Sequence, residues 1–281
     1  MEMTTPQLPE VLYHYCPSAA LPEILRSGVL WLTHQSGLND LREAVWVVPF
    51  IRNAIRRRQT EATKGFFFQL MELFELNSSE GIYVAGFSSD GDMLSQWRAY
   101  AMDGDGFAIG FRPKAFCAEL RIPMTSYVAD HTVGFLKVQY DNKMLKQMIE
   151  TILDDFLSGL QESGNPLTYF LRLRALALSF KNPAFKEEDE WRISYSPMIH
   201  SIQGRHGLEV TGMLSEMRFR TSRYGVLPYF EIPFDKPDRE DAIVEVVIGP
   251  KNPSIEGLVE MLLLSLGYHS ASVRRSSASY R

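Results

Sequence analysis

The sequence predicts an α+β fold, and three observations carry this prediction. Short β-rich runs alternate irregularly with helical segments, a pattern that suits an α+β domain better than a doubly wound parallel sheet. Apolar residues between 145 and 160 recur at helical spacing without a miss, which indicates one long amphipathic helix. The sequence contains no repeat, no low-complexity stretch and no clear linker, so residues 1–281 are expected to form a single domain.

The first part of the chain is expected to form a strand, a helix and a second strand. Residues 11–16 alternate and are β-rich, and a short helix is predicted over 18–26 with Ser18 as its N-cap. Gly28 follows this helix, where glycine readily adopts the left-handed conformation. The next elements are expected in this order: a strand at 29–34, mostly helix over 41–74, a strand at 82–87, a helix or turn at 93–102 and a strand at 107–111.

The second half of the chain is expected to alternate in the same way. A strand is predicted over 133–140, and residues 169–180 are apolar enough for a buried helix that ends before Pro183. Further elements are expected as follows: strands at 190–195 and 243–248, a helix at 257–266 and a last strand or tail at 272–281, with 208–220 ambiguous. Two helical insertions into the sheet domain are therefore predicted, at about 41–75 and 141–182.

Composition and charge place the chain among globular proteins of a reducing compartment. Hydrophobic residues make up 45% of the chain, charged residues 22%, and the net charge of −5 argues against wrapping long nucleic acid. Cys16 and Cys117 are the two cysteines, and no metal-ligand spacing surrounds them, so neither a disulfide nor a structural zinc is expected. Without a leader-like stretch or a long apolar run, we expect a cytoplasmic protein with no membrane contact.

A titratable side chain lies inside the first predicted strand, in Tyr13-His14-Tyr15. On a strand, His14 shares a face with Leu12, whereas Tyr13 and Tyr15 point to the other face. A histidine in this position needs partners for its ring nitrogens. It is either a buried ring whose nitrogen bonds a backbone carbonyl, which is the commoner case for a lone histidine, or a ligand-binding group.

Two later residues could complete a site with His14. Tyr83 could stack on a planar ring, or it could be an ordinary aromatic residue of a sheet. Glu190 ends a run of four acids, 187–190, which repel one another unless something stabilises them. If Glu190 begins a strand, it shares a polar face with Arg192. It could then bond a ribose hydroxyl, or it could belong to a solvated charge run paired with Arg192.

Further candidate contacts come from an aromatic and basic segment. Trp97, Arg98 and Tyr100 follow Ser88 closely, and they could line a nucleotide pocket or form a helix face packed on the sheet. The sequence contains no P-loop, GxSxG, HExxH or EF-hand pattern, and no histidine has metal-ligand spacing. No metal site is therefore expected.

At full length the chain resembles a bacterial family known only as domain of unknown function 2971. The segments that carry this resemblance are 12–15, 37–40, 87–88, Trp97 with Tyr100, 106–111, 190–192, 249–251 and 279–281. They span nearly the whole chain. The family brings no established activity, so this resemblance implies no reaction.

A more distant resemblance implies a mechanism. Residues 14–30 resemble the first strand and helix of poly-ADP-ribose polymerases and of DNA-modifying ADP-ribosyltransferase toxins, and 81–85 resemble the strand that carries the tyrosine of the polymerase-like group. The resemblance implies an ADP-ribosyltransferase-like split sheet, mixed and antiparallel, with helical insertions. It also implies a triad of His14, Tyr83 and Glu190. The polymerase-like group commonly has Gly-Ser or Gly-Thr after its histidine, whereas Tyr15 and Cys16 follow here.

This resemblance implies that the chain takes NAD as a substrate. His14 would bond the adenosine-side ribose, Tyr83 or Ser88 would hold the middle position, and Glu190 would stabilise an oxocarbenium-like transition state. The expected cofactor-binding residues are Tyr15, Ser88, Trp97, Arg98, Tyr100 and Arg192. Transfer to a protein or nucleic acid would make the chain an ADP-ribosyltransferase of a bacterial toxin, effector or phage-defence system. Transfer to water would make it an NAD glycohydrolase.

Two other functions stay open on the sequence. A non-catalytic module that senses a nucleotide or binds a protein is favoured by the missing glycine after His14 and by the acidic run 187–190. A nucleic-acid-processing enzyme is favoured by two groups of arginines, although basic patches on an acidic protein are commonly solvated faces. These arginines are Arg52, Arg56, Arg57 and Arg58 in the first group and Arg274, Arg275 and Arg281 in the second.

Overall fold

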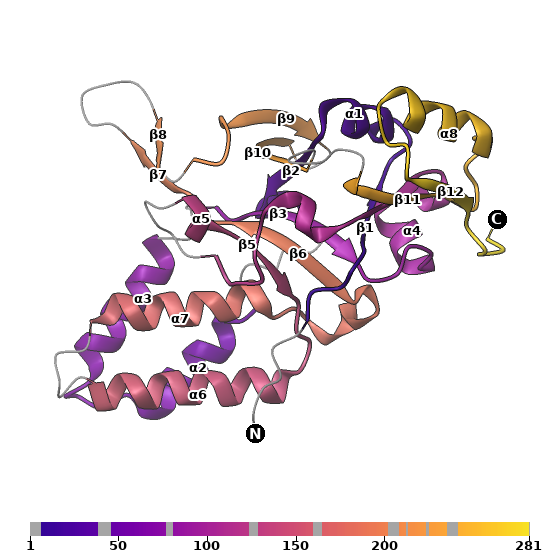
Figure 1. Cartoon of the computed structure of the whole chain (residues 1–281). Helices are drawn as coiled ribbons and strands as arrows, with labels where there is room; N and C mark the ends of the chain where they lie inside the picture. Colours follow the sequence, from indigo (N-terminus) through magenta and orange to yellow (C-terminus); the bar gives the residue numbers. More distant parts are fainter. Residues whose placement is uncertain are drawn as a thin grey trace.

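The α+β fold predicted from the sequence is confirmed in its coarse form by a computed structural model. A mixed, largely antiparallel open sheet carries several helices (Figure 1). The structure describes residues 7–38, 46–76, 81–123, 129–159, 165–201, 208–211, 213–222, 225–234 and 241–280. Of the predicted features, Asn39, Asp40, helical residues 41–45, Leu160 and Arg281 lie outside the described residues. Within the described residues, no helix is both long enough and apolar enough to cross a bilayer.

One long path of paired strands forms the sheet. Its order is β12 (Ser272–Arg275), β11 (Ile243–Ile248), β4 (Phe107–Phe111), β1 (Leu12–Cys16), β3 (Tyr83–Ser88), β2 (Val29–His34), β10 (Gly225–Pro233) and β9 (Arg218–Ser222). The β11–β12 pair is parallel, and the other pairs on this path are antiparallel. A branch leaves β3 through β6 (Glu190–Tyr195) to β5 (Val133–Lys137). A separate hairpin joins β7 (Met198–Ser201) to β8 (Leu208–Thr211).

Strand β3 is the centre of the sheet because three strands pair with it. Strand β6 covers one edge of β3 along its whole length, from Tyr83 to Ser88. The other edge is divided: β1 pairs with its end at Ser88, and β2 pairs with its start at Tyr83 and Val84. Gly86 lies between these pairings, so β1 and β2 separate there and leave an opening in the sheet.

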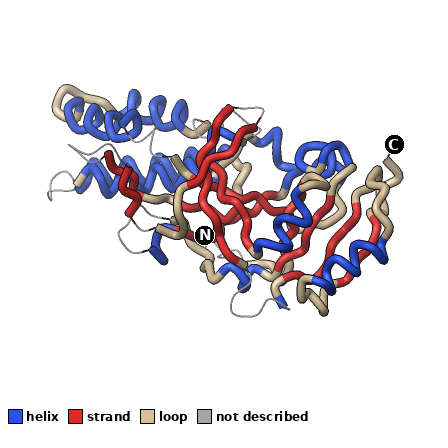
Figure 2. Tube along the Cα trace, turned by 90° about the horizontal axis from the view of Figure 1, so that it is seen from above, coloured by secondary structure: helices blue, strands red, loops and turns tan. Residues whose placement is uncertain are grey.

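The helices form two groups. Four of them pack together beside the sheet, at the lower left of Figure 1 and the upper left of Figure 2: α2 (Val48–Arg58), α3 (Lys64–Leu76), α6 (Asn142–Gly159) and α7 (Pro166–Ser179). The others contact the sheet domain: α1 (Ala20–Ser27), α4 (Leu94–Tyr100), α5 (Ala129–Thr132) and α8 (Glu256–Ser265). The four packed helices fall in the segments predicted as insertions.

Each group has its own apolar core. The four-helix group buries Leu145, Ile149 and Phe156 of the amphipathic stripe on α6 against residues of α2, α3 and α7. In the sheet domain the apolar core includes Leu12 and Cys16 of β1 and Trp191, Ile193 and Tyr195 of β6. The prediction that alternate residues of β6 share a face that enters the core is therefore confirmed, because residues two apart on a strand share a face. The opposite, polar face of β6 is buried as well.

Three local features test the predicted element boundaries. Gly28 ends α1 with φ 66°, and its amide donates to the Ile24 carbonyl, as predicted for a left-handed cap. The Ser18 N-cap was a wrong prediction: α1 begins at Ala20, and the Ser18 hydroxyl bonds the Asp105 carbonyl and the Asn252 amide instead. Strand β10 has no counterpart among the predicted elements. Pro228 and Pro233 interrupt its apolar pattern, and its pairing with β2 and β9 is a tertiary contact.

A close backbone approach at Gly106 joins the start of β4 to the end of β1. A Cβ atom at this position would lie 2.2 Å from the Cys16 carbonyl oxygen and 2.9 Å from the Ala101 Cα. Neither backbone atom can move aside cheaply. A Cβ at Gly257, by contrast, would meet nothing within 4 Å.

Gly106→Ala is expected to lower the free energy of unfolding by about 1–3 kcal/mol, because the new methyl group overpacks two backbone segments. Gly257→Ala, in the first turn of α8, is the matched control. It is expected to leave stability unchanged or to raise it by up to about 1 kcal/mol, since alanine favours helix over glycine. Urea unfolding of both variants measures the difference, and equal effects would contradict the close approach at Gly106.

Candidate functional site

A cleft opens where β1 and β2 separate. Its volume is about 640 Å³, which falls in the usual range for small-molecule sites. Residues of β1, α1, β2 and β3 form most of its wall, and α4 adds two residues, while β6, β9 and β10 add one each. His14 and Glu190, two of the predicted triad residues, line this cleft.

His14 is held at the opening by the backbone of Gly86. Its Nδ1 lies 2.9 Å from the Gly86 carbonyl oxygen, and the centres of the His14 and Phe87 rings are 5.7 Å apart. A carbonyl oxygen can only accept, so Nδ1 carries the proton of the neutral ring and Nε2 is an acceptor. Burial lowers the pKa of His14, and the bond to Gly86 offsets only part of that effect. The ring is therefore neutral at pH 7, and no described residue bonds Nε2.

Glu190 begins β6 inside a buried charge cluster. Arg192 donates to both of its carboxylate oxygens, with Nε–Oε1 at 2.6 Å and Nη2–Oε2 at 2.7 Å. Lys181 adds a third bond to Oε2 at 3.1 Å. Burial alone would raise the pKa of Glu190, but the two cations overcome it and lower the pKa to about 2. Glu190 is thus a stable carboxylate at neutral pH.

Because Gly86 has no side chain, the carboxylate of Glu190 is accessible from the cleft. A Cβ at Gly86 would lie 3.3 Å from Oε1 of Glu190, so the glycine leaves the space in front of this oxygen empty. Oε2 already accepts two bonds, whereas Oε1 accepts one. A carboxylate oxygen has two lone-pair sites, so Oε1 keeps one for a ligand. Gly86 therefore lies between the two groups. His14 bonds its carbonyl oxygen, and Oε1 of Glu190 lies near the position that a Cβ atom would occupy.

A second carboxyl extends the cluster toward α4. Lys181 lies 2.6 Å from Glu188, and the Tyr100 hydroxyl donates to the same carboxyl at 3.2 Å. Burial raises the pKa of Glu188, and the neighbouring Glu190 charge adds to the rise, against the opposing effect of Lys181. Gln96 donates to the Glu188 carbonyl, so α4 and the segment before β6 are linked. Tyr100, Gln96 and Lys181 all line the cleft.

The acidic run is stabilised, although not by solvent. Glu188 and Glu190 are buried, and Asp189 pairs with Lys137. The expected pair of Glu190 with Arg192 exists, but the interpretation of a solvated charge run is wrong. Sequence alone could not reveal this, because Lys181 and Lys137 come from other segments.

Two candidates for the middle position of the triad lie outside the cleft. Tyr83 is 2% exposed. The centre of its ring lies 4.6 Å from the centre of the Phe230 ring and 6.2 Å from that of the Tyr195 ring. Its face of β3 belongs to the apolar core. Ser88 is fully buried, and its hydroxyl accepts a bond from the Asp90 amide. The expected convergence of His14, Tyr83 and Glu190 is therefore not found.

The remaining predicted contacts divide between the cleft wall and the protein interior. Tyr15 and Tyr100 line the cleft, whereas Trp97, Arg98 and Arg192 do not. Trp97 is fully buried, and the centres of its ring and the Tyr15 ring are 4.8 Å apart. Of the two alternatives that the sequence left open, Trp97 therefore belongs to a packed helix face. Arg98 is exposed, and its guanidinium carbon lies 4.7 Å from the centre of the Tyr280 ring.

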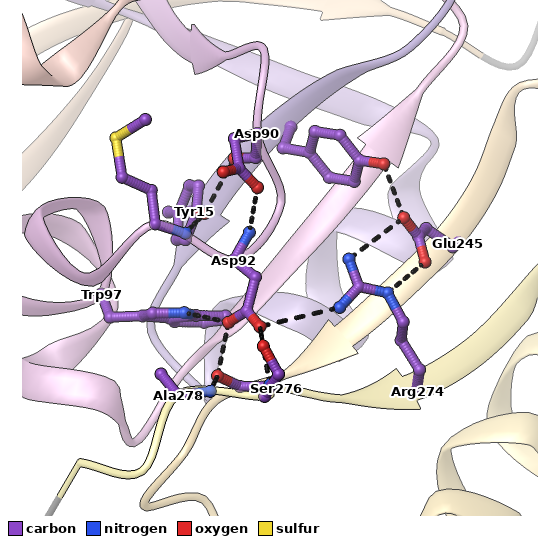
Figure 3. Close-up of polar contacts among 11 residues, drawn as sticks. Tyr15, Asp90, Asp92, Trp97, Glu245, Arg274, Ser276 and Ala278 are labelled. Carbon is purple, nitrogen blue, oxygen red and sulfur yellow. Dashed lines mark hydrogen bonds and ion pairs between the residues drawn. The ribbon is translucent and has the colours of Figure 1, made fainter.

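The C-terminal segment fastens the loop that precedes α4, as Figure 3 shows. Asp92 accepts bonds from the Trp97 indole, at 2.8 Å, and from Ser276 and the Ser277 amide. Arg274 bridges to Glu245 at 2.8 Å and lies 3.9 Å from Asp92. The tail thus fixes the position of α4, which contributes Gln96 and Tyr100 to the cleft.

Four of the arginines that suggested nucleic-acid binding form ion pairs. Arg57 and Arg58 pair with Glu150 of α6, and Arg58 also pairs with Asp154. In the second group, Arg274 pairs with Glu245 and Arg275 with Glu256. Their charge is therefore partly neutralised within the protein.

Several cleft residues were not predicted from the sequence. Nothing in the local sequence marks Lys181, Trp31 or Arg220 as residues of a site. Gly86 could have been noticed, since a glycine inside a strand often indicates close approach of another group. No group of His, Cys, Asp or Glu able to hold a metal ion occurs in the part of the chain that the structure describes.

Comparison with known proteins finds a family model that matches part of the chain, but no activity. The model of a family described as "Protein of unknown function (DUF2971)" matches residues 96–193, from α4 into β6. The matched segment contains Gln96, Tyr100, Lys181 and Glu190. No curated protein and no solved structure matches the chain significantly. The resemblance to this family is therefore supported over the matched segment, whereas no comparison supports the resemblance to ADP-ribosyltransferases.

The buried cluster predicts a specific pH dependence of stability. The pKa of Glu190 falls from 4.5 to about 2 on folding, so its contribution is complete above pH 4.5 and is lost as the pH falls toward 2. Glu190→Gln leaves two buried cations short of a partner and is expected to cost about 3 kcal/mol at pH 7. The gap between wild type and variant should narrow as the pH falls from 4.5 to 2.

Urea unfolding at several pH values measures this gap. Glu260→Gln, at an exposed position of α8, is the control and should stay within about 0.5 kcal/mol of wild type. A gap between wild type and Glu190→Gln that does not change with pH would contradict the cluster.

Proposed function

We propose that the protein cleaves the bond between nicotinamide and ribose in NAD and transfers the ADP-ribosyl group to an acceptor. One observation carries this proposal: a neutral histidine acceptor and an ionised carboxylate meet on either side of Gly86, at the opening between β1 and β2. Such a pair suits a sugar, because it can bond hydroxyl groups and hold negative charge beside a reacting carbon.

In the proposed reaction, Oε1 of Glu190 accepts a hydrogen bond from a hydroxyl of the nicotinamide ribose. The bond from the anomeric carbon to nitrogen breaks, and its electron pair goes to the nicotinamide ring, whose positive charge disappears. Positive charge then develops on the ribose, and the carboxylate stabilises it. A lone pair of the acceptor forms the new bond to the anomeric carbon, and the acceptor proton leaves to solvent.

His14 has a binding role in this proposal. Its Nε2 accepts a bond from a hydroxyl of the adenosine-side ribose while Nδ1 stays on Gly86. Because burial lowers the pKa of His14, the ring keeps this acceptor at neutral pH. The fixed Nδ1 bond also sets the direction in which Nε2 points.

The proposal gives Tyr83 no contact with the substrate. Tyr100 is the aromatic residue we assign beside the nicotinamide, since it lines the cleft and bonds Glu188, which shares Lys181 with Glu190. The acceptor is a protein, a nucleic acid or water. With water as acceptor, the activity is that of an NAD glycohydrolase.

A second candidate function is a non-catalytic module that binds a nucleotide in the same cleft. The observation that favours it is the ion pairing of Glu190, because Arg192 and Lys181 together use three of its lone-pair sites and oppose its charge. On this reading, the cluster would hold a nucleotide without cleaving it.

Incubation with NAD tests the leading proposal. Wild type is expected to release nicotinamide, measured by liquid chromatography, and Glu190→Gln to lower the rate by about 10²–10³-fold because it removes the stabilising charge. His14→Asn should raise KM for NAD. Tyr83→Phe is the matched control and should stay near the wild-type rate, since this ring lies in the core.

All variants are assayed below their unfolding transitions, so that lost activity is not lost folding. Thermal shifts with NAD decide between the two candidates: binding without nicotinamide release favours the non-catalytic module. Neither binding nor release, with protein, nucleic acid and water as acceptors, would contradict both. A large loss of activity in Tyr83→Phe would contradict the assignment of roles.

A further inference from the structure

One cation in the cleft wall, Arg220, has no anionic partner among the residues that the structure describes. Arg220 of β9 lines the cleft, and no carboxylate of the described residues lies within ion-pair distance of it. The other charged side chains of the wall are paired: Glu23 with Arg26, Lys181 with Glu188 and Glu190, and Glu231 with Arg218. The charge of Arg220 is thus the one left uncompensated in the described wall.

The guanidinium of Arg220 is also short of hydrogen bonds. Its Nη2 donates to the Thr33 hydroxyl at 3.2 Å, but its buried Nε has no partner among the described residues. Burial lowers the pKa of Arg220, which reflects the cost of holding the charge there. An arginine stays protonated even so, and an unpartnered buried donor costs free energy. A bound anion would remove this cost.

Two side chains of β2 set the position of the guanidinium. Trp31 lies with its ring centre 5.8 Å from the guanidinium carbon, and Thr33 accepts the Nη2 bond. On β10, Glu231 lies opposite Trp31 and Tyr229 lies opposite Thr33, so all four side chains share one face of the sheet. Arg220 pairs with Leu227, two residues before Tyr229 on β10, and therefore extends over the same face. The long side chain therefore reaches from β9 over β10 to β2.

Strand β2 borders the opening that holds His14 and Glu190. Thr33 pairs with Val84, two residues before Gly86. The guanidinium thus lies on the same cleft wall as the proposed reaction site, although β9 is three strands away from β3 in the sheet order. A ligand whose ribose occupies the space at Gly86 and which carries phosphate beside that ribose would bring the phosphate toward Arg220.

We propose that Arg220 binds a phosphate group of the nucleotide that occupies this cleft, with Trp31 and Thr33 as positioning residues. This inference rests on the proposed function, for which it assigns the diphosphate of the substrate. The planar guanidinium offers donors on adjacent nitrogens, which suits the oxygens of a phosphate. A charge-assisted bond of this kind strengthens binding by about ten- to a hundredfold.

Titration calorimetry with ADP-ribose tests the subsite, because this probe carries the diphosphate and no nicotinamide. Arg220→Met keeps the apolar stem, and we expect it to weaken ADP-ribose binding about ten- to a hundredfold. We also expect an unchanged or higher melting temperature, since an uncompensated buried charge is removed. Raising the KCl concentration should weaken binding by wild type more than binding by Arg220→Met.

Arg218→Met is the matched control. Arg218 lies two residues away on the same face of β9 but pairs with Glu231 and does not line the cleft. We expect it to change ADP-ribose affinity less than about threefold, although it removes the same charge. Equal losses in the two variants, an unchanged affinity in Arg220→Met, or no ADP-ribose binding by wild type would each overturn the subsite.

NAD turnover separates this proposal from the function on which it rests. We expect Arg220→Met to raise KM for NAD about tenfold or more with kcat unchanged, as for loss of a binding contact. If wild type binds ADP-ribose through Arg220 but releases no nicotinamide, the subsite stands and the proposed reaction fails. If wild type cleaves NAD and Arg220→Met leaves KM unchanged, the reaction stands and the subsite fails.

Discussion

The divided edge of β3 is the constraint on which the rest of the site depends. Strand β6 occupies one edge throughout, while β1 and β2 share the other and separate at Gly86. The Gly86 carbonyl lies at the point where these two strands separate, and His14 Nδ1 donates a hydrogen bond to it. The two interpretations of His14 are therefore not exclusive. One ring nitrogen satisfies a carbonyl, as in the commoner structural case, and the same bond leaves the other nitrogen facing the cleft.

The buried charges behind Gly86 represent a second constraint. Lys181, Arg192, Glu188 and Glu190 form a balanced group of two cations and two carboxyls away from solvent. Apolar residues in such a place often give equal or higher stability, so a buried ionic group is weak support for a purely structural role. Strongly shifted pKa values beside a cleft are typical of functional sites. In the proposed function, the cluster keeps Glu190 ionised and fixed while Oε1 stays open to the ligand.

Distant parts of the chain cooperate to build this cleft. The N-terminal strand supplies His14, α4 supplies Gln96 and Tyr100, and β6 supplies Glu190. The C-terminal tail holds the loop before α4 through Asp92 (Figure 3). The four-helix group packs around a core of its own, and α7 leads directly into Lys181. Truncation of the tail would therefore act on the cleft wall through α4, although none of the described tail residues lines the cleft.

Local sequence patterns determined the elements and their buried faces. The alternation of β1 and β6, the amphipathic stripe of α6 and the glycine cap of α1 follow from chain geometry and short-range burial, which adjacent residues encode. These patterns also placed His14 and Glu190 on strands, where both are found. Strand β10 escaped prediction because its apolar residues are interrupted by prolines and its pairing partners lie far away in sequence.

Tertiary structure alone decided which of these residues meet. Tyr83 shares its face of β3 with the apolar core, and Lys181 and Arg220 reach the cleft from segments without any local signal. The ionisation of Glu190 likewise depends on Arg192, two residues away, and on Lys181, which only the fold brings near. The physical reason is that periodicity reports burial of a face, whereas a site depends on the separation of strands and on charge pairs between segments distant in sequence. The sequence by itself therefore determined the α+β fold, and the division of one strand edge determined the site.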